Sequence, residues 1–262
     1  MSLKEALCRS TTACNDEFAA WGCFVAELHT TASRKPELRE EARALVNRNV
    51  QEVRLLQQYS PSAERWRELL GPASADRING AGRSLEAMGT RFAEVEGVCW
   101  THGDCWPPSV LCRSDGCWLI DWEFTHWGRM AQDLGHVAAH VWLSGLTEES
   151  MVPTEKTVSI WKAFWMSYVR ALDADEDLAT LFDKEAQADC MRHMGAEVLG
   201  RVSGEFSAWT ADDARGKCRV GAEAALALVE AGDAVARGER PGCDPWILEW
   251  WEPLCLLGRD GD

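Results

Sequence analysis

Apolar side chains recur every three or four positions along most of the chain, and this spacing predicts helices. Residues 15–31 follow it with Phe18, Trp21, Val25 and Leu28. The other predicted helices cover residues 37–58, 61–70, 83–95, 131–145, 154–172, 183–203, 211–236 and 245–256.

A short central part of the chain has a different pattern, with brief apolar runs bounded by turn residues. Residues 98–101 (Val-Cys-Trp-Thr) predict a strand. Residues 110–112 and 117–120 flank an Asp-Gly turn, which predicts a β-hairpin. The expected fold class is therefore mainly α (α+β) with a small central β-hairpin. Because no interdomain linker is evident, we expect residues 1–262 to form a single domain.

The charge and hydropathy of the chain exclude several classes of partner. The formal net charge of −15 argues against nucleic acid, because phosphate binding requires a basic surface. No apolar run approaches the roughly 20 residues that span a bilayer. The first residues, MSLKEALCRSTTACNDEF, are too polar for a secretory signal. We therefore expect a cytoplasmic protein that binds neither nucleic acid nor membrane.

Cysteine and tryptophan are unusually frequent, with 11 and 14 residues. Structural zinc requires closely spaced ligand pairs, and the chain has no Cys-x-x-Cys. Cys112 and Cys117 flank the predicted hairpin turn, and we expect mostly buried free thiols. Most tryptophans are expected in the core. A cluster between residues 100 and 127 has a second interpretation, as the aromatic lining of a pocket for an apolar ligand.

Two aspartates follow the predicted strands. Asp104 comes soon after the first strand, and Asp121 comes directly after the hairpin. Two carboxylates brought together at strand ends can hold a divalent cation or supply a general base. The alternative is that both only cap turns. Spacing alone does not decide between these interpretations.

Residues 99–136, CWTHGDCWPPSVLCRSDGCWLIDWEFTHWGRMAQDLGH, carry a more specific pattern. His102-Gly103-Asp104 matches the run His-Gly-Asp-x-x-x-x-Asn, and residues 120–123 match the run Ile-Asp-Trp-Glu. Gly128, Asp133 and Leu134 match the continuation Gly-x-x-x-x-Asp-Leu. In these motifs the segment resembles the aminoglycoside phosphotransferase and choline-kinase-like family. Residues 21–29 are similar to the helix that opens the C-terminal lobe of that family.

The resemblance implies a kinase-like C-terminal lobe and a role for each matched side chain. Asp104 would be the base that accepts the substrate hydroxyl proton, and His102 would steady the catalytic loop. Asp121 would bind magnesium, and Asp133 would brace the loop from a helix start. Phosphoryl transfer depends mainly on positioning and charge neutralisation, and such a site supplies both.

The chain departs from the family pattern in two places. The second metal ligand of the family, an asparagine, is Ser109 here, and it follows Pro108, which restricts the loop backbone. Ahead of the catalytic loop the only lysines are Lys4 and Lys35, and neither lies in an apolar strand. We therefore expect a truncated, degenerate member that lacks the N-terminal ATP-binding lobe.

The leading hypothesis is a kinase-fold protein that binds a small apolar organic molecule in the former acceptor pocket. It would perform a cofactor-free cyclisation or rearrangement in secondary metabolism, without metal or phosphoryl transfer. His102, Asp104 and Asp121 would be catalytic. The predicted substrate-binding residues are Trp106, Ser109, Trp122, Glu123, Trp127, His136 and His140.

Two alternatives remain open. The first is a small-molecule phosphotransferase that uses ATP and Mg, with Asp121 and Ser109 holding the metal. The second is a non-catalytic binding or scaffold pseudokinase, which could form a homodimer through the face exposed by loss of the N-terminal lobe. His136 and His140 lie four residues apart, a spacing used in metal sites, but no His-Glu-x-x-His motif accompanies them, so a core or pocket-lining role is favoured.

Overall fold

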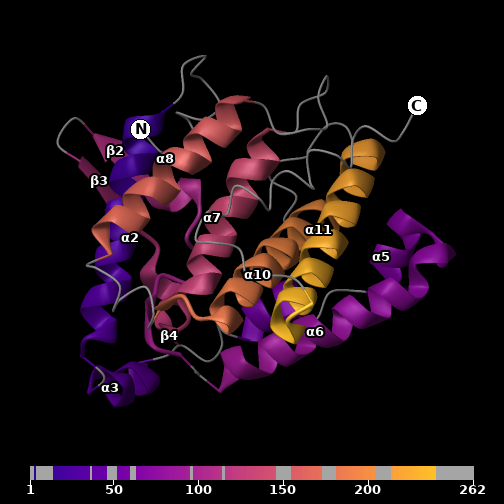
Figure 1. Cartoon of the computed structure of the whole chain (residues 1–262), viewed down its shortest axis with the longest axis horizontal. Coiled ribbons are helices and arrows are strands. Elements are labelled where there is room, and N and C mark those ends of the chain that lie inside the picture. Colours follow the sequence, from indigo (N-terminus) through magenta and orange to yellow (C-terminus); the bar gives the residue numbers. More distant parts are fainter. Residues whose placement is uncertain are drawn as a thin grey trace.

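The structure is a computed structural model, and it describes residues 3, 14–35, 37–45, 52–59, 63–94, 97–113, 116–145, 155–172, 181–203 and 214–239. The helices in this part of the chain are α2 (Asn15–Ser33), α3 (Leu38–Leu45), α5 (Ala63–Leu70), α6 (Ala75–Ala93), α7 (Met130–Ser144), α8 (Glu155–Ala171), α10 (Lys184–Ser203) and α11 (Ala214–Arg237) (Figure 1). The strands are β1 (Cys99–Thr101), β2 (Val110–Arg113), β3 (Gly116–Leu119) and β4 (His126–Gly128). Short turns of other helix types are η1 (Leu55–Tyr59, a π-helix), η2 (Pro72–Ser74), η3 (Pro107–Ser109) and η4 (Trp122–Phe124), the last three of 3₁₀ type.

The predicted fold class is confirmed, because the described chain is mainly helical and β2 pairs with β3 as the predicted hairpin. Most long helices begin and end within three residues of their predicted limits. In the range predicted as one helix over 37–58, the structure has α3 and the π-helical turn η1, and residues 46–51 lie outside the described part. The predicted helix over 245–256 also lies outside it.

Two elements differ from the sequence-based expectation. Helix α6 begins at Ala75, eight residues before the predicted start, because Gly80 and Gly82 are accommodated inside a helix that buries Ile78, Ala81 and Leu85 on one face. The unpredicted strand β4 pairs antiparallel with β1. It is only three residues long and buried throughout, so it has no alternating pattern to signal it.

Helix α7 forms the centre of the molecule, and every residue from Met130 to Leu143 is buried. Figure 1 shows α2 and α8 side by side on one flank of α7, and α10 and α11 on the other. Helices α2 and α8 approach closely at Gly22, where a Cβ would lie 2.3 Å from the carbonyl oxygen of Phe164.

Tryptophans supply much of the core, as predicted. Six of the ten described tryptophans are buried: Trp21, Trp66, Trp127, Trp142, Trp161 and Trp165. Trp21 packs edge-on against Phe164, which stacks on Trp161. Of the eight described cysteines six are buried, which confirms the predicted burial of most thiols. No helix in the described ranges has both the length and the hydropathy that a membrane crossing requires.

Candidate active site

The backbone that follows β1 is held by one carboxylate. Both oxygens of Asp133, in the first turn of α7, accept hydrogen bonds from backbone N–H groups: His102 donates to Oδ2 at 2.7 Å and Gly103 donates to Oδ1 at 2.8 Å. Burial alone would raise the pKa of Asp133, but these bonds and the nearby His29 lower it to about 2. Asp133 therefore acts as a fixed, charged bracket for the loop.

Gly103 allows the loop to turn sharply. Its φ is +78°, a conformation that side chains with a Cβ rarely adopt. A Cβ at this position would also lie 2.2 Å from the carbonyl oxygen of Phe124. Two independent structural constraints therefore require glycine at this position of the His-Gly-Asp motif.

Two buried histidines make further hydrogen bonds that hold the loop in place. His102 donates from Nε2 to the carbonyl oxygen of Ile120 at 2.9 Å, so it joins the loop to the residue before Asp121. His29, in α2, donates from Nε2 to Asp133 at 3.1 Å and accepts at Nδ1 from the hydroxyl of Tyr168 at 2.9 Å. The loop is therefore linked through side chains to α2, α7 and α8.

Asp104 makes an ion pair that the sequence did not predict. Its Oδ1 accepts from Nη2 of Arg54 at 2.5 Å, and the aspartate side chain is 15% exposed. The buried guanidinium of Arg54 also lies over the ring of Phe124, 4.2 Å from its centroid. Among the described residues, no hydrogen bond is made to Oδ2 of Asp104. One oxygen is thus bound and the other remains available.

Ser109 precedes β2 and Asp121 follows β3, as expected from the sequence, so both lie at the open end of the hairpin, opposite its turn. Asp121 is exposed, and it alone among the described non-glycine residues has a positive φ, at 63°. The carbonyl oxygen of Ser109 accepts from the N–H of Ile120 at 2.9 Å, which brings Ser109 beside the residue preceding Asp121. The hydroxyl of Ser109 is buried and has no hydrogen-bond partner among the described residues.

His136 and His140 belong to a buried polar cluster whose centre is Glu197 of α10. His140 donates from Nε2 to Oε1 of Glu197 at 2.7 Å, and His136 lies 3.9 Å from Oε2. The amide nitrogen of Gln58 lies 2.9 Å from Nε2 of His136 and also donates to Glu197. Arg201 donates from Nε to Glu197 at 2.7 Å.

Burial determines the protonation of this cluster. It lowers the pKa of His136 to about 4 and also lowers the pKa of His140, although Glu197 opposes both shifts. Burial alone would raise the pKa of Glu197, but Arg201 and the two histidines hold it well below its usual value. The cluster is therefore a carboxylate with neutral imidazoles and a guanidinium. Within the described ranges, no group of three or more His, Cys, Asp or Glu side chains is placed to hold a metal ion.

The three tryptophans predicted to line a pocket each have different contacts in the structure. Trp106 lies between His140, at 5.1 Å between ring centroids, and the guanidinium of Arg201, 4.5 Å from the Trp106 ring. Trp122 is 41% exposed and packs edge-on against His102, and Glu123 beside it is exposed. Trp127 is buried and donates from Nε1 to the carbonyl oxygen of Gly97 at 2.9 Å.

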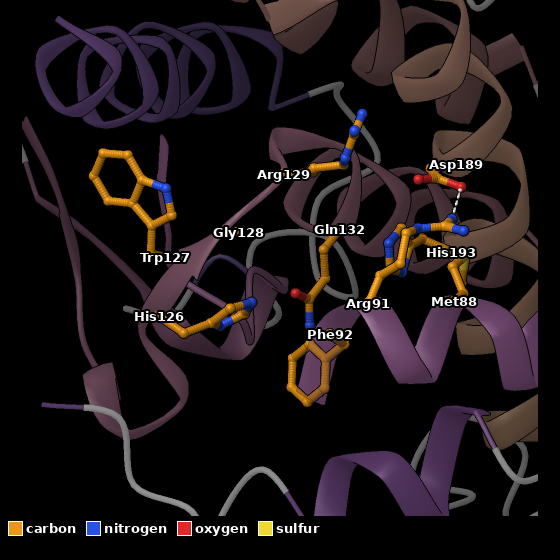
Figure 2. A pocket seen from close by; sticks show the side chains of 10 residues that line it. All are labelled: Met88, Arg91, Phe92, His126, Trp127, Gly128, Arg129, Gln132, Asp189 and His193. Atoms are coloured by element: carbon orange, nitrogen blue, oxygen red, sulfur yellow. Dashed lines mark hydrogen bonds and ion pairs between the residues drawn. The ribbon is translucent and has the colours of Figure 1, made fainter. Parts of the chain in front are cut away.

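A small cavity lies between α6, β4, α7 and α10 (Figure 2). Its volume of about 30 Å³ is close to the share of one water molecule in the liquid. Its lining residues are Met88, Arg91, Phe92, His126, Trp127, Gly128, Arg129, Gln132, Asp189 and His193. Gln132 connects it to the loop by donating to the carbonyl oxygen of Gly103 at 3.3 Å. This cavity is too small for a substrate, since ligand pockets typically measure roughly 300–1,000 Å³.

The braced His-Gly-Asp loop, with a second aspartate after the hairpin, agrees with the comparison to protein families. The family model described as "Phosphotransferase enzyme family" matches residues 10–153, more than half of the chain. The chain belongs to this family. The resemblance read from the sequence is thereby confirmed, and a comparison with curated proteins gives no match.

Several side chains of this phosphotransferase-family site were not predicted from the sequence. Arg54 and Gln58 come from a segment predicted only as a charged amphipathic helix, and Glu197 and Arg201 come from α10, outside the residues that match the family. None belongs to a motif. The sequence offered one signal for Glu197: helical spacing in the predicted helix places this charged residue among neighbours that are buried.

Proposed function

We propose that this chain transfers a phosphoryl group from a magnesium-bound nucleotide to a hydroxyl group of a small polar molecule. The observation that carries the proposal is the bracing of residues 102–104 by Asp133, which orients a carboxylate that has one unbonded oxygen. Positioning of this kind is the main requirement of phosphoryl transfer.

Asp104 is the proposed base. Arg54 occupies Oδ1 and restricts the rotation of the carboxylate, so Oδ2 is presented to an incoming hydroxyl. The acceptor proton moves to Oδ2 of Asp104 as the acceptor oxygen attacks the γ-phosphorus of the nucleotide. The bond from that phosphorus to the β–γ bridging oxygen breaks, and the nucleoside diphosphate leaves.

Asp121 and Ser109 fit the needs of a magnesium ion. Asp121 offers an exposed carboxylate on a left-handed backbone, and Ser109 offers a hydroxyl with no described partner. Mg²⁺ commonly uses one or two protein oxygens together with substrate phosphates and water. When bound, the ion would neutralise charge on the transferred phosphoryl group. Asp121 and Ser109 would hold the ion, and the hydrogen bond from His102 to Ile120 fixes the end of the hairpin against the loop.

The acceptor is proposed to be polar because the open groups of the site are carboxylate oxygens. Oδ2 of Asp104 accepts no hydrogen bond among the described residues, and Asp121 is exposed. An apolar ligand over these carboxylates would remove them from water without returning a hydrogen bond, which costs free energy.

Titration calorimetry with ATP and MgCl₂ tests the proposal. Wild-type protein should bind ATP in a magnesium-dependent manner, and Asp121→Ala should weaken that binding by at least about tenfold, as expected when one charge clamp is removed. Glu86→Ala removes an exposed carboxylate of α6 and is the matched control. Absence of binding in folded wild-type protein, or equal binding in Asp121→Ala, would refute the magnesium site.

A second candidate function, cofactor-free cyclisation or rearrangement of a small organic molecule, is favoured by one observation. Ahead of the His-Gly-Asp loop the only lysines are Lys4 and Lys35, and neither lies in an apolar strand that could hold nucleotide phosphates. Turnover of a substrate in EDTA without nucleotide, abolished in Asp104→Asn, would support this candidate. Strict dependence of turnover on ATP and Mg²⁺ would exclude it.

A further inference from the structure

The hairpin carries two thiols in direct contact. Cys112 of β2 and Cys117 of β3 are register partners, and their sulfur atoms lie 2.9 Å apart as a thiol hydrogen bond. Both are free cysteines. Neither has a role in the proposed phosphoryl transfer, so their pairing requires a separate explanation.

Backbone geometry at this pair permits a covalent bridge. Directly opposed residues of antiparallel strands have Cα atoms roughly 4.5–5.5 Å apart, which lies within the range of about 4.4–6.8 Å found for disulfides. A disulfide requires the sulfur atoms to approach to about 2.05 Å, so they must close by about 0.9 Å from their present separation of 2.9 Å. Side-chain rotation can supply that movement without changing the register of the strands.

The two thiols differ in access. Cys117 is half-buried, and its sulfur lies 3.8 Å from the carbonyl oxygen of Glu17. Cys112 is buried, and burial together with the adjacent Cys117 thiol raises its pKa. An oxidant that arrives from solvent therefore meets Cys117 first.

We propose that Cys112 and Cys117 form a reversible intrachain disulfide that clamps the hairpin. The oxidant is a low-molecular-weight disulfide such as oxidised glutathione. The Cys117 thiolate attacks one of its sulfurs and releases one reduced glutathione. The Cys112 thiolate then attacks the Cys117 sulfur of the mixed disulfide and releases the second. The protein loses two protons and two electrons, and the glutathione disulfide gains them.

The position of the pair gives the bridge a structural effect. Ser109 directly precedes β2, and Asp121 follows β3 after one residue. A bridge between the strands would limit fraying of the hairpin that carries both residues. The bridge itself does not depend on the proposed phosphotransferase function, and its test measures sulfur chemistry alone.

Tryptic mapping tests the inference, because the sequence separates the two thiols. Trypsin cleaves after Arg91, Arg113 and Arg129, so Cys112 lies in peptide 92–113 and Cys117 is the sole cysteine of peptide 114–129. Full-length protein is equilibrated with oxidised glutathione, alkylated under denaturing conditions, digested and analysed by mass spectrometry. We expect the two peptides to appear as one linked species, lighter by two hydrogens than their sum, that disappears after treatment with dithiothreitol.

Matched variants identify the sulfur atoms. Cys112→Ser and Cys117→Ser should each abolish the linked species, whereas Cys23→Ser, which removes an exposed cysteine of α2, should leave it unchanged. Fragment masses distinguish Cys112 from Cys99 and Cys105, which share its peptide. Absence of the linked species in oxidised, folded protein overturns the proposal, and so does a link that persists in Cys112→Ser.

Discussion

Asp133 accepts hydrogen bonds from the N–H groups of His102 and Gly103, so replacing it acts directly on the loop over residues 102–104. In Asp133→Asn, one N–H faces an amide NH₂ group and loses its acceptor. We expect the free energy of unfolding to fall by about 2–4 kcal/mol, because a buried donor is left unsatisfied and a paired charge is lost. Urea denaturation measures this.

The matched control is Asp76→Asn, an exposed carboxylate in the first turn of α6. It should change stability by no more than about 1 kcal/mol, through the helix dipole alone. Equal effects of the two substitutions would show that Asp133 does not brace the loop.

His136 makes stability depend on pH. Burial lowers its pKa in the folded protein from 6.5 to about 4, so between these values the unfolded chain binds a proton that the folded protein does not. The contribution of His136 is therefore complete above pH 6.5 and is lost as pH falls towards 4, by about 3 kcal/mol in total. Urea denaturation across this range should show a shallower pH dependence in His136→Gln than in wild type. Parallel curves would contradict the assignment.

Ser109→Ala separates ligand binding from folding. Because the hydroxyl is buried without a described partner, its removal should leave stability unchanged or raise it by up to about 1 kcal/mol. Magnesium-dependent ATP affinity should fall, since a proposed metal ligand is lost. Thermal unfolding and titration calorimetry measure the two effects. A large loss of stability with unchanged affinity would place Ser109 in the core and not at the metal.

Among the helices, the closest approach of α2 to α8 depends on a residue with no side chain. A Cβ at Gly22 would lie 2.3 Å from the backbone oxygen of Phe164, so Gly22→Ala must push the helices apart. We expect a loss of about 1–3 kcal/mol in unfolding free energy, typical of overpacking.

Gly82→Ala is the control for this comparison, because a Cβ there meets nothing within 4 Å and the residue lies inside α6. That substitution should stabilise the protein by roughly 0.5–1 kcal/mol through lower backbone freedom of the unfolded chain. If both substitutions stabilise, the packing of α2 on α8 is looser than described.

The length of an element decided whether it could be predicted from the sequence. The long helices α2, α7, α8, α10 and α11 were recognisable, because each has many turns over which helical spacing repeats. The start of α6 was predicted at residue 83, and the part that was missed contains Gly80 and Gly82, whose low helix propensity is overridden by packing. The strand β4 was missed because three residues cannot display a period.

For the whole molecule, the site is assembled from distant parts of the chain. Local motifs identified His102, Asp104, Asp121 and Asp133, and the structure joins His102 to Asp133 and to Ile120, the residue before Asp121. The ion pair with Arg54 spans 50 positions, and the contact of His140 with Glu197 spans 57. Such partners depend on how helices pack, which no local pattern contains. The sequence therefore predicted the loop but not its surroundings.

The most direct test of the account is transfer of label from γ-labelled ATP with Mg²⁺ to a pooled set of sugars, aminocyclitols and amino alcohols. Wild type and Glu86→Ala should both yield labelled acceptor. The folded Asp104→Asn variant should transfer label at least about a hundredfold more slowly than wild type, because general-base catalysis typically contributes a factor of that size. Equal transfer by Asp104→Asn, or no labelled acceptor with folded wild-type protein, would contradict the account.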